Sequence, residues 1–349
     1  MTVKGKKLKL RSACAVVTPS NVSDAMNEFL SDTNRCPSWN YKRQDAAVSR
    51  ALSVHKNVHT EYLDIALHIV REVIGKFGSE SEYLKQAGGN MVSADEVEVR
   101  VQNYINSNRL NRIVRVKQKD VLTGATMNMH APNNWVMYIS RRGMPANFIE
   151  GCCHHEIGTH CLRGVNEQSQ VWHHKRKKYN VQTNLKTEEG LACLNTQLSL
   201  EPEYRYLWKA ALHYVAVCRG EHMSFSELFD SLEEFIDDKE RRYRQCVRVK
   251  RGLQDHSEQS VFCRDQAYLI GAVNILRAMH TISDIRVLYC GLVSLSSLDR
   301  VRRIARPDSI KLPPFLRGHQ NSMAYLEALE GMVSLNNIAE NLDILPPEE

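Results

Sequence analysis

Residues 152–161 read C-C-H-H-E-I-G-T-H-C, and this stretch decides the fold that we predict. The preceding R-R-G-M-P at 141–145 interrupts regular structure, and Asn147 is the expected start of a helix that carries the stretch. His155 and His160 lie five residues apart on that helix, with Glu156 directly after the first histidine. This spacing raises the question of whether both imidazoles can reach one metal ion.

A regular α-helix would separate these two imidazoles. Successive residues advance by roughly 100° around an α-helix, so histidines in the pattern H-E-x-x-H lie only about 40° apart. Histidines five residues apart diverge by roughly 140°. A π-helical segment, with roughly 4.4 residues per turn, returns them to about 50°, and such segments favour functional sites. Gly158 lies between the histidines and weakens the α-helical preference of this turn, so we predict a π-bulge and a shared ion.

A third ligand is expected downstream, in T-E-E-G-L-A at 187–192. A catalytic zinc takes three protein ligands, commonly His, His and Glu in peptidases, and keeps a fourth position open. Glu189 is followed by Gly-Leu-Ala, which resembles the E-G-x-A segment that supplies the zinc glutamate in gluzincin peptidases. We therefore expect Glu189 rather than Glu188 to coordinate Zn²⁺, and Thr187 to be the N-cap of their helix.

Glu156 is the predicted general base. Zinc brings the pKa of a bound water toward neutral, and an adjacent carboxylate can take its proton and later deliver it to a leaving amine. The alternative is a histidine cluster that binds no metal. A second pair, His55 and His59, has the better spacing of four residues but carries Lys56 where a catalytic site needs a carboxylate, so we expect no metal there.

The periodicity of the chain predicts an α+β fold that is mainly α. Alternating apolar residues between 113 and 139 predict a small antiparallel sheet beside the motif helix. Helices are expected over 23–30, 46–76, 93–106, 187–200, 203–219, 224–245, 260–280 and 284–293. We predict a basic, loosely ordered segment over 1–35 and one metallopeptidase domain over 36–349, with N-terminal helices and the sheet up to about 150 and a helical half after the motif.

Composition narrows the class of protein. Hydrophobic residues make up 43% and charged residues 25%, which is typical of a folded globular chain. The sequence lacks the run of roughly 18 apolar residues that a membrane span needs, and its start lacks a secretory signal, so we predict a cytoplasmic protein that does not enter a membrane. The ten cysteines include no C-x-x-C pair and are expected to be reduced thiols.

The net charge of +6 is concentrated in four basic runs, at 4–11, 109–119, 173–178 and 241–251. Such runs are usually solvated faces, and the alternative is attraction of an acidic partner. No zinc-finger or RNA-stacking pattern accompanies them, so we expect no nucleic-acid partner.

Three stretches carry a resemblance to a known family: residues 147–166 around H-E-I-G-T-H, T-E-E-G-L-A at 187–192, and F-C-R-D-Q-A-Y-L-I-G at 262–271. They resemble the microtubule-associated tyrosine carboxypeptidase (MATCAP) family, atypical H-E-x-x-x-H zinc peptidases that remove the C-terminal tyrosine of α-tubulin. The similarity extends from about residue 45 to the C-terminus. It implies that His155, His160 and Glu189 bind Zn²⁺ and that Glu156 is catalytic. Cys263-Arg264-Asp265 departs from the F-T-K-D of relatives, which would pass any substrate role of that lysine to Arg264.

The implied substrate is an acidic tail that ends in an aromatic residue with a free carboxylate. A bidentate arginine suits that carboxylate, and Arg163 and Arg264 are the candidates, with a structural ion pair as the alternative for each. Tyr214 and Tyr268 are candidate donors to the oxyanion, with core packing as the alternative. The strand at 135–140 is either the edge along which substrate adds as a strand or an ordinary sheet strand.

We therefore predict a zinc-dependent carboxypeptidase that removes a C-terminal tyrosine from an acidic tail, with the α-tubulin tail on microtubules as the expected substrate. One alternative is a zinc endopeptidase, or a peptidase of broader specificity, that acts on acidic peptides. Another is a microtubule-binding module without activity, which the intact Glu156 argues against.

Overall fold

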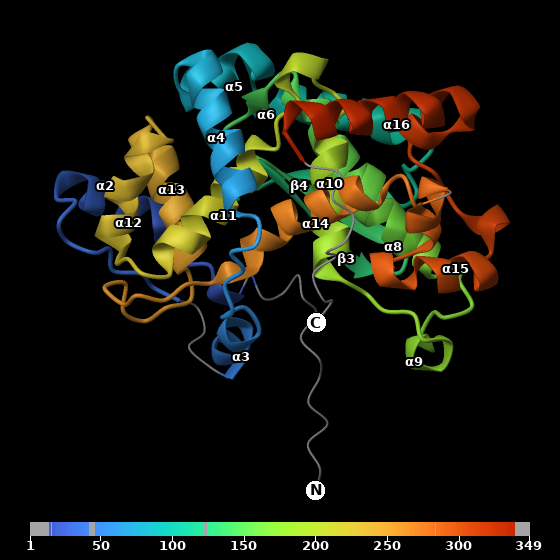
Figure 1. Cartoon of the computed structure of the whole chain (residues 1–349), viewed down its shortest axis with the longest axis horizontal. Coiled ribbons are helices and arrows are strands. Elements are labelled where there is room, and N and C mark those ends of the chain that lie inside the picture. The colour runs from blue at the N-terminus through green and yellow to red at the C-terminus, as the bar shows by residue number, and fades with distance from the viewer. Residues whose placement is uncertain are drawn as a thin grey trace, which may run out of the picture. The chain divides into compact units, whose positions relative to one another are not determined.

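The computed structural model describes residues 14, 16–41, 46–119, 121, 124–282 and 284–338 (Figure 1). The chain divides into two compact units, each built from two stretches of sequence. Unit 1 comprises Met1–Ser81 and Trp208–Gln266, and unit 2 comprises Glu82–Leu207 and Ala267–Glu349. The motif helix and Glu189 therefore belong to the same unit, unit 2. The basic run at 4–11 lies outside the described residues.

Unit 1 is built from helices in its described part. They are α2 (Val22–Ser31), α3 (Ala46–Val54), α4 (Leu63–Phe77), α11 (Trp208–Gly220), α12 (Phe225–Ser231), η3 (Leu232–Glu234), α13 (Lys239–Lys250) and η4 (Cys263–Gln266). The apolar face of α4 packs against α11. Phe29 of α2 is buried and contacts the rings of Phe225 and Phe229 at centroid distances of 5.0 and 4.9 Å. The prediction of a loosely ordered segment is therefore wrong for residues 22–31, because α2 contributes to the core.

Unit 2 combines helices with two small sheets. Its elements begin with α5 (Glu80–Gly88), which crosses the unit boundary, and continue with β1 (Met91–Val92), α6 (Ala94–Ser107), β2 (Val114–Lys119), β3 (Ala125–Ala131), β4 (Asn134–Ser140), β5 (Met144–Pro145), α7 (Phe148–Cys153), the π-helix η1 (His154–Cys161), α8 (Leu162–Glu167), α9 (Arg176–Tyr179), α10 (Leu185–Gln197), η2 (Pro202–Tyr204), α14 (Ala267–Ala278), η5 (Ile285–Cys290), η6 (Leu295–Ser297), α15 (Leu298–Ile304), η7 (Pro307–Ser309), η8 (Pro314–Leu316) and α16 (Gly318–Leu335). The chain is thus mainly helical with small sheets, as the predicted α+β class requires.

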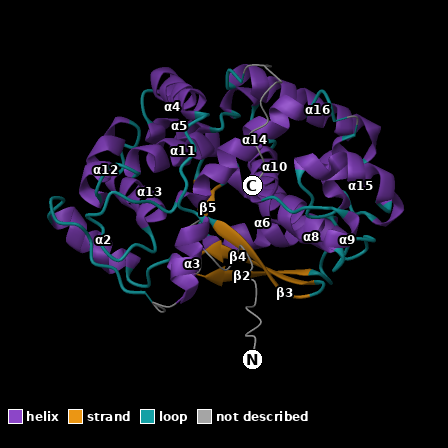
Figure 2. Cartoon of the chain, turned by 60° about the horizontal axis from the view of Figure 1, so that its bottom comes forward, coloured by secondary structure: helices purple, strands orange, loops and turns teal. Residues whose placement is uncertain are grey.

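The larger sheet has the strand order β2-β4-β3 (Figure 2). Strand β4 pairs with β3 in antiparallel and with β2 in parallel orientation, so the prediction of an antiparallel sheet is confirmed for β3 and β4 and wrong for β2 and β4. The hairpin between β3 and β4 folds β4 back between its two predecessors. Because β4 is paired on both sides, it has no free edge, so of the two alternatives for residues 135–140 the structure shows an ordinary sheet strand and not an edge for an added substrate strand.

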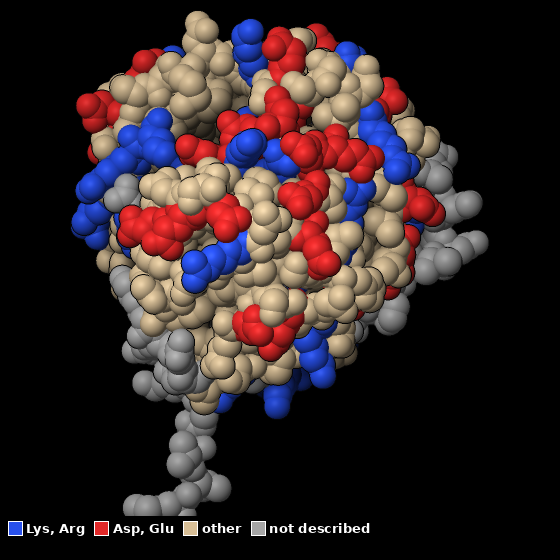
Figure 3. All heavy atoms as spheres, turned by 90° about the vertical axis from the view of Figure 1, so that its left-hand side faces the viewer, with Lys and Arg blue, Asp and Glu red and all other residues tan. Residues whose placement is uncertain are grey.

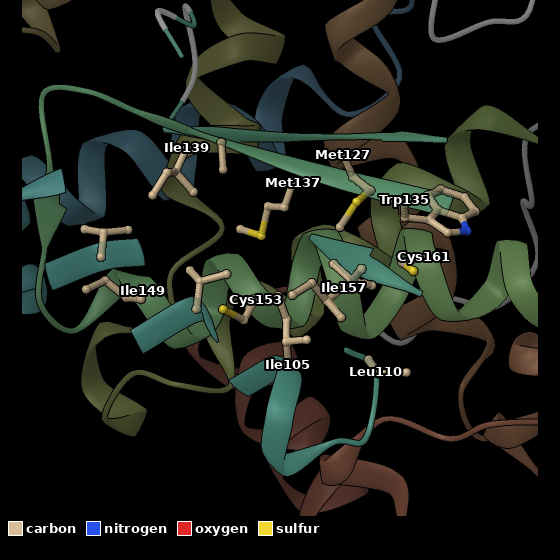
Figure 4. Packing of buried hydrophobic residues seen from close by; sticks show 14 of the residues in the cluster. Ile105, Leu110, Met127, Trp135, Met137, Ile139, Ile149, Cys153, Ile157 and Cys161 are labelled. Atoms are coloured by element: carbon tan, nitrogen blue, oxygen red, sulfur yellow. The ribbon is translucent and has the colours of Figure 1, made fainter. Parts of the chain in front are cut away.

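The sheet supports the motif helix from one side. Met127 of β3 and Met137 and Ile139 of β4 are buried against Ile157 and Cys161 of η1 (Figure 4). Helix α6 closes the same core with its buried valines and begins at the predicted N-cap Ser93, whose hydroxyl accepts a hydrogen bond from the Glu96 amide at 3.2 Å. The motif helix is therefore held by apolar packing along its length.

Helix α10, which carries Glu189, is held by close contact with α14. A Cβ atom on Gly190 would lie 2.1 Å from the carbonyl carbon of Gly271, so only glycine permits this approach. The N-cap of α10 is Asn184, whose side chain accepts from the amides of Lys186 and Thr187. The prediction that Thr187 is the N-cap is wrong, since its hydroxyl instead accepts from the Leu295 amide at 3.2 Å.

Several helix boundaries differ from the prediction. The helix expected over 46–76 is interrupted between α3 and α4, and the one expected over 224–245 is divided into α12 and α13. Residues 285–290 form a 3-10 helix. None of the helices in the described part of the chain is both long and apolar enough to cross a lipid bilayer.

Candidate metal centre

The predicted irregularity of the motif helix is present. Residues His154–Cys161 form a π-helix that continues without a break from α7 into α8. The hydroxyl of Thr159 donates to the carbonyl of His154 at 2.8 Å, five residues earlier. The wider turn leaves both histidines of the motif on one side of the helix, with their ring centroids 5.0 Å apart. The prediction of a π-bulge is therefore confirmed.

Three ligand atoms converge beside this turn. One nitrogen of His155, one of His160 and a carboxylate oxygen of Glu189 all lie within 4.8 Å of one another. Nε2 of His160 is 3.5 Å from Oε2 of Glu189. Two imidazole nitrogens and one carboxylate oxygen are the donor set of many catalytic zinc sites, so these residues could hold such an ion. Among the described residues these three form the only such cluster, and the pair His55 and His59 is not part of one.

A second set of contacts orients the two imidazoles. Nδ1 of His160 lies 2.8 Å from Oε1 of Glu188, and because a carboxylate only accepts, this nitrogen carries the proton. Nδ1 of His155 lies 3.0 Å from the hydroxyl of Thr196, which itself donates to the Ala192 carbonyl at 2.8 Å and therefore accepts from the imidazole. Both rings keep the lone pair on Nε2, the nitrogen that faces away from these partners.

The two adjacent glutamates of α10 thus contact the same imidazole through different nitrogens. Glu189 is 5% exposed and lies beside Nε2 of His160, whereas Glu188 is partly exposed and bonds Nδ1. This arrangement agrees with the expectation that one of the pair coordinates. It also gives the other a role that the sequence analysis did not predict.

Glu156 lies on the same π-helix, directly after His155, and is half-buried. It is the neighbour in sequence of His155, a candidate metal ligand. A carboxylate at this place can hold and transfer a proton within the site.

A buried polar network supports the π-helix from behind. The amide of Asn195 donates to the Thr159 hydroxyl at 2.7 Å and to the Tyr289 hydroxyl at 2.8 Å. The Tyr325 hydroxyl donates to the Asn195 carbonyl oxygen at 2.9 Å. Burial raises the pKa of both tyrosines, which therefore remain neutral. The network joins the π-helix to α10, η5 and α16, and so resists a return of the turn to α-helical geometry.

Arg163 does not lie free for a substrate. Its side chain is 1% exposed, Nε donates to the carbonyls of Leu288 and Gly291 at 2.9 and 3.1 Å, and one terminal nitrogen donates to the Val293 carbonyl at 2.8 Å. Burial lowers the pKa of this guanidinium. Arg163 therefore holds the loop after η5, and the prediction that it clamps a substrate carboxylate is wrong.

Two further predicted substrate residues belong to unit 1. Arg264 is buried, and its Nη1 lies 3.8 Å from Oδ1 of Asp265, the ion pair that was the alternative for this residue. Tyr214 is fully buried in α11, and its hydroxyl accepts from the Tyr62 amide at 3.2 Å, which favours a role in the core. Tyr268 is half-buried near the start of α14 in unit 2. Substrate contacts by Arg264, Tyr214 and Tyr268 stay predictions.

Glu188 and Thr196 are the positioning residues that the sequence analysis missed. A signal for Thr196 was available, because it follows Glu189 by seven residues, or about two turns of an α-helix, and so shares its face. No such signal was available for Glu188. Adjacent residues on a helix point in different directions, and only the position of His160 decides which of the two glutamates its Nδ1 contacts.

Sequence comparison finds relatives over nearly the whole chain. The model of the family described as microtubule-associated tyrosine carboxypeptidase matches residues 53–337. Mouse MATCAP2 is 32% identical over 344 residues, which cover 97% of this chain and 64% of the mouse protein. Human microtubule-associated tyrosine carboxypeptidase 1 is 31% identical over 335 residues, which cover 95% of this chain and 70% of the human protein. The chain therefore spans less than two thirds of the length of the first of these relatives.

Proposed function

The chain belongs to the microtubule-associated tyrosine carboxypeptidase family, and from this premise we propose that it is a zinc-dependent carboxypeptidase that removes a C-terminal tyrosine from an acidic protein tail. We propose the tail of α-tubulin as its substrate, and the microtubules of the cytoplasm as the place of the reaction. The names of the relatives support tyrosine as the residue that is removed and microtubules as the place of the reaction. The observation that carries the proposal is the convergence of three ligand atoms beside a π-helical turn.

We propose that the site is arranged as in gluzincin peptidases. Two histidines of one helix and a glutamate of a following helix, here His155, His160 and Glu189, would hold the zinc ion. The protonated Nδ1 atoms fit this assignment, because each leaves an Nε2 lone pair for a metal. A zinc ion held there would polarise the scissile carbonyl and lower the pKa of a water molecule.

The remaining chemistry falls to residues of the chain. Glu156 takes a proton from the attacking water while the oxygen of that water forms a bond to the carbonyl carbon. Glu156 then delivers a proton to the nitrogen of the leaving tyrosine when the peptide bond breaks. Glu188 and Thr196 keep the two imidazoles in one tautomer and one orientation during this cycle. The products are free tyrosine and a tail that is one residue shorter.

The decisive experiment is mass spectrometry of a peptide that ends in Glu-Glu-Tyr, incubated with the protein in the presence and absence of a chelator. We expect release of tyrosine that stops with the chelator and returns with added zinc. The same peptide with a C-terminal amide should be cleaved far more slowly, because an exopeptidase recognises the free carboxylate. Equal cleavage of both peptides would favour an endopeptidase, and an intact acid peptide would remove the proposed activity.

A further inference from the structure

A basic surface lies on unit 2, apart from the predicted ligands. It is formed by exposed cations of α9 and α15 and their flanking residues: Lys175, Lys177, Lys178, Arg300, Arg302 and Arg303. The two helices are neighbours in Figure 2, and in Figure 1 α9 lies below α15. The Arg300 guanidinium joins them directly, because its Nε donates to the Tyr179 carbonyl at 3.1 Å. Two stretches more than 100 residues apart in the sequence thus form one surface.

Helix α8, the continuation of the motif helix, fixes this basic surface. One carboxylate oxygen of the buried Glu167, at the end of α8, is contacted by Arg176 of α9 at 2.6 Å, by the Trp172 indole at 3.0 Å and by the Leu292 amide at 3.2 Å. Arg176 also donates to the Leu292 carbonyl at 3.0 Å. A buried charge with several partners holds its neighbours in place. The α9 side of the basic surface is therefore anchored to the helix that carries the candidate metal ligands, and Arg300 joins α15 to α9.

The charges of the basic surface are largely uncompensated. Residues 168–187 contain no aspartate or glutamate. In α15 the one carboxylate, Asp299, lies 3.3 Å from Arg302. Across the described residues, no carboxylate lies within ion-pair distance of Lys175, Lys177 or Arg303. An excess of one sign of charge on a fixed surface attracts the opposite charge.

Unit 1 carries its surface charges differently. On the face drawn in Figure 3, acidic and basic side chains are interspersed. Arg219 and Glu234 lie 2.6 Å apart, and Arg241 and Glu80 lie 2.8 Å apart. Paired charges of this kind create little net attraction for a charged partner. The basic surface of unit 2 is therefore a local feature and does not merely reflect the basic composition of the chain.

We propose that the basic surface binds the acidic run of a substrate polypeptide, upstream of the residue that is removed; this inference rests on the proposed function. His160 and Glu167 are seven residues apart on one continuous helix, a rise of about 10 Å. An extended peptide covers that length with about three residues. Acidic side chains a few positions before a C-terminal tyrosine would then meet the basic surface.

A polypeptide fits the basic surface better than a nucleic acid does. Proteins that bind single strands place aromatic rings for the bases to stack on. The aromatic side chain of α9, Tyr179, is half-buried and lies 5.6 Å from Nζ of its neighbour Lys178. The rings of His173 and His174, just before Lys175, face each other with centroids 3.8 Å apart, so the exposed lysines and arginines are what the basic surface offers a partner. Such cations suit a row of flexible carboxylates.

The test is binding of a fluorescein-labelled peptide of eight glutamates followed by tyrosine, measured by fluorescence anisotropy. The full chain carrying Glu156→Gln is used, so that the peptide is bound and not cleaved. In this background we compare the triple variant K175E/K177E/K178E with R50E/K56E/K239E, which makes the same change of net charge at exposed residues of unit 1. We expect at least ~10-fold weaker binding for the first variant and less than about 2-fold for the second.

A second variant on the other side of the basic surface, R302E/R303E, keeps the test independent of α9 if the first variant does not fold. Equal binding by all folded variants would overturn the proposal, as would equal weakening by the unit 1 control. A fluorescein-labelled 20-nucleotide DNA that binds more tightly than the peptide, and loses this binding in K175E/K177E/K178E, would overturn it in favour of nucleic acid.

Cleavage separates this inference from the proposed function. In chains with Glu156 intact, tyrosine release from a short uncharged peptide should be equal in parent and surface variants, whereas KM for the acidic peptide should rise. If no chain releases tyrosine from any peptide, the proposed function fails while the binding measurement still decides the basic surface. If tyrosine is released but binding is insensitive to the variants, the inference about the basic surface fails alone.

Discussion

Replacing Glu188 by alanine removes the carboxylate that bonds Nδ1 of His160 at 2.8 Å. A hydrogen bond to a charged group contributes about 1.5–3 kcal/mol, and the 21% exposure of Glu188 places this one in the lower part of that range. The loss of about 1.5–2 kcal/mol corresponds to ~10- to 30-fold weaker zinc binding, because the imidazole loses its preferred tautomer and orientation. The Nε2 atom of His160 is still present to bind the ion.

Zinc affinity is measured by equilibrium competition with a chromogenic chelator. Thr196→Val is the matched control at the other imidazole, where a neutral hydroxyl accepts from His155 at 3.0 Å. A bond between neutral groups contributes about 0.5–1 kcal/mol, so we expect only ~2- to 5-fold weaker binding. Glu188→Gln keeps an acceptor without the charge and should lie between the two.

The outcome separates the two adjacent glutamates. Zinc affinity of Glu188→Ala within about 2-fold of the parent would refute the reasoning about imidazole orientation. Complete loss of zinc in Glu188→Ala, with retention in Glu189→Ala, would show that Glu188 is the ligand and that Glu189 is not. We expect the reverse, since Glu189 lies beside Nε2 of His160.

Three further predictions concern catalysis, packing and pH. Glu156→Gln should lower kcat by ~10²- to 10⁴-fold and keep zinc. The control is Glu150→Gln, which changes an exposed glutamate in the preceding turns and should keep activity. A fully active Glu156→Gln would exclude Glu156 as the general base. Gly190→Ala should lower the free energy of unfolding by about 3 kcal/mol, because the added methyl group meets the backbone of α14. Gly331 has open space around it, so Gly331→Ala should not destabilise the chain. Thermal unfolding of both variants checks this. Burial and nearby arginines lower the pKa of His55 to about 4 in the folded chain, below its usual value of 6.5, so the unfolded chain takes up the proton first and stability is lost as pH falls from 6.5 to 4. Urea unfolding across this range should show a smaller loss in His55→Leu than in the parent, and an equal loss would contradict the assignment.

The residues of the metal centre could be predicted because their relation is local. His155, Glu156 and His160 lie on one helix, and the angle between side chains on a helix follows from their spacing alone. The five-residue spacing therefore required a wider turn, and the structure has a π-helix there. The segment with Glu189 could also be chosen from its residues, since Glu189 followed by Gly-Leu-Ala resembles the E-G-x-A segment of gluzincin peptidases.

Contacts between distant segments could not be predicted in the same way. Arg163 follows His160 by one turn, and an arginine could bind a substrate carboxylate. In the fold its guanidinium instead donates hydrogen bonds to backbone carbonyls within residues 288–293. The apolar run W-V-M-Y-I at 135–139 predicts a strand, but only the fold shows that this strand lies between β2 and β3. The sequence by itself determined the helical pattern, the motif and the need for a distorted turn, because these depend on neighbours along the chain. The tertiary structure alone decided which polar groups have hydrogen-bond partners and which strand edges are paired. The reason is that some of these partners lie more than 100 positions away in the sequence, and that buried polar groups must be paired.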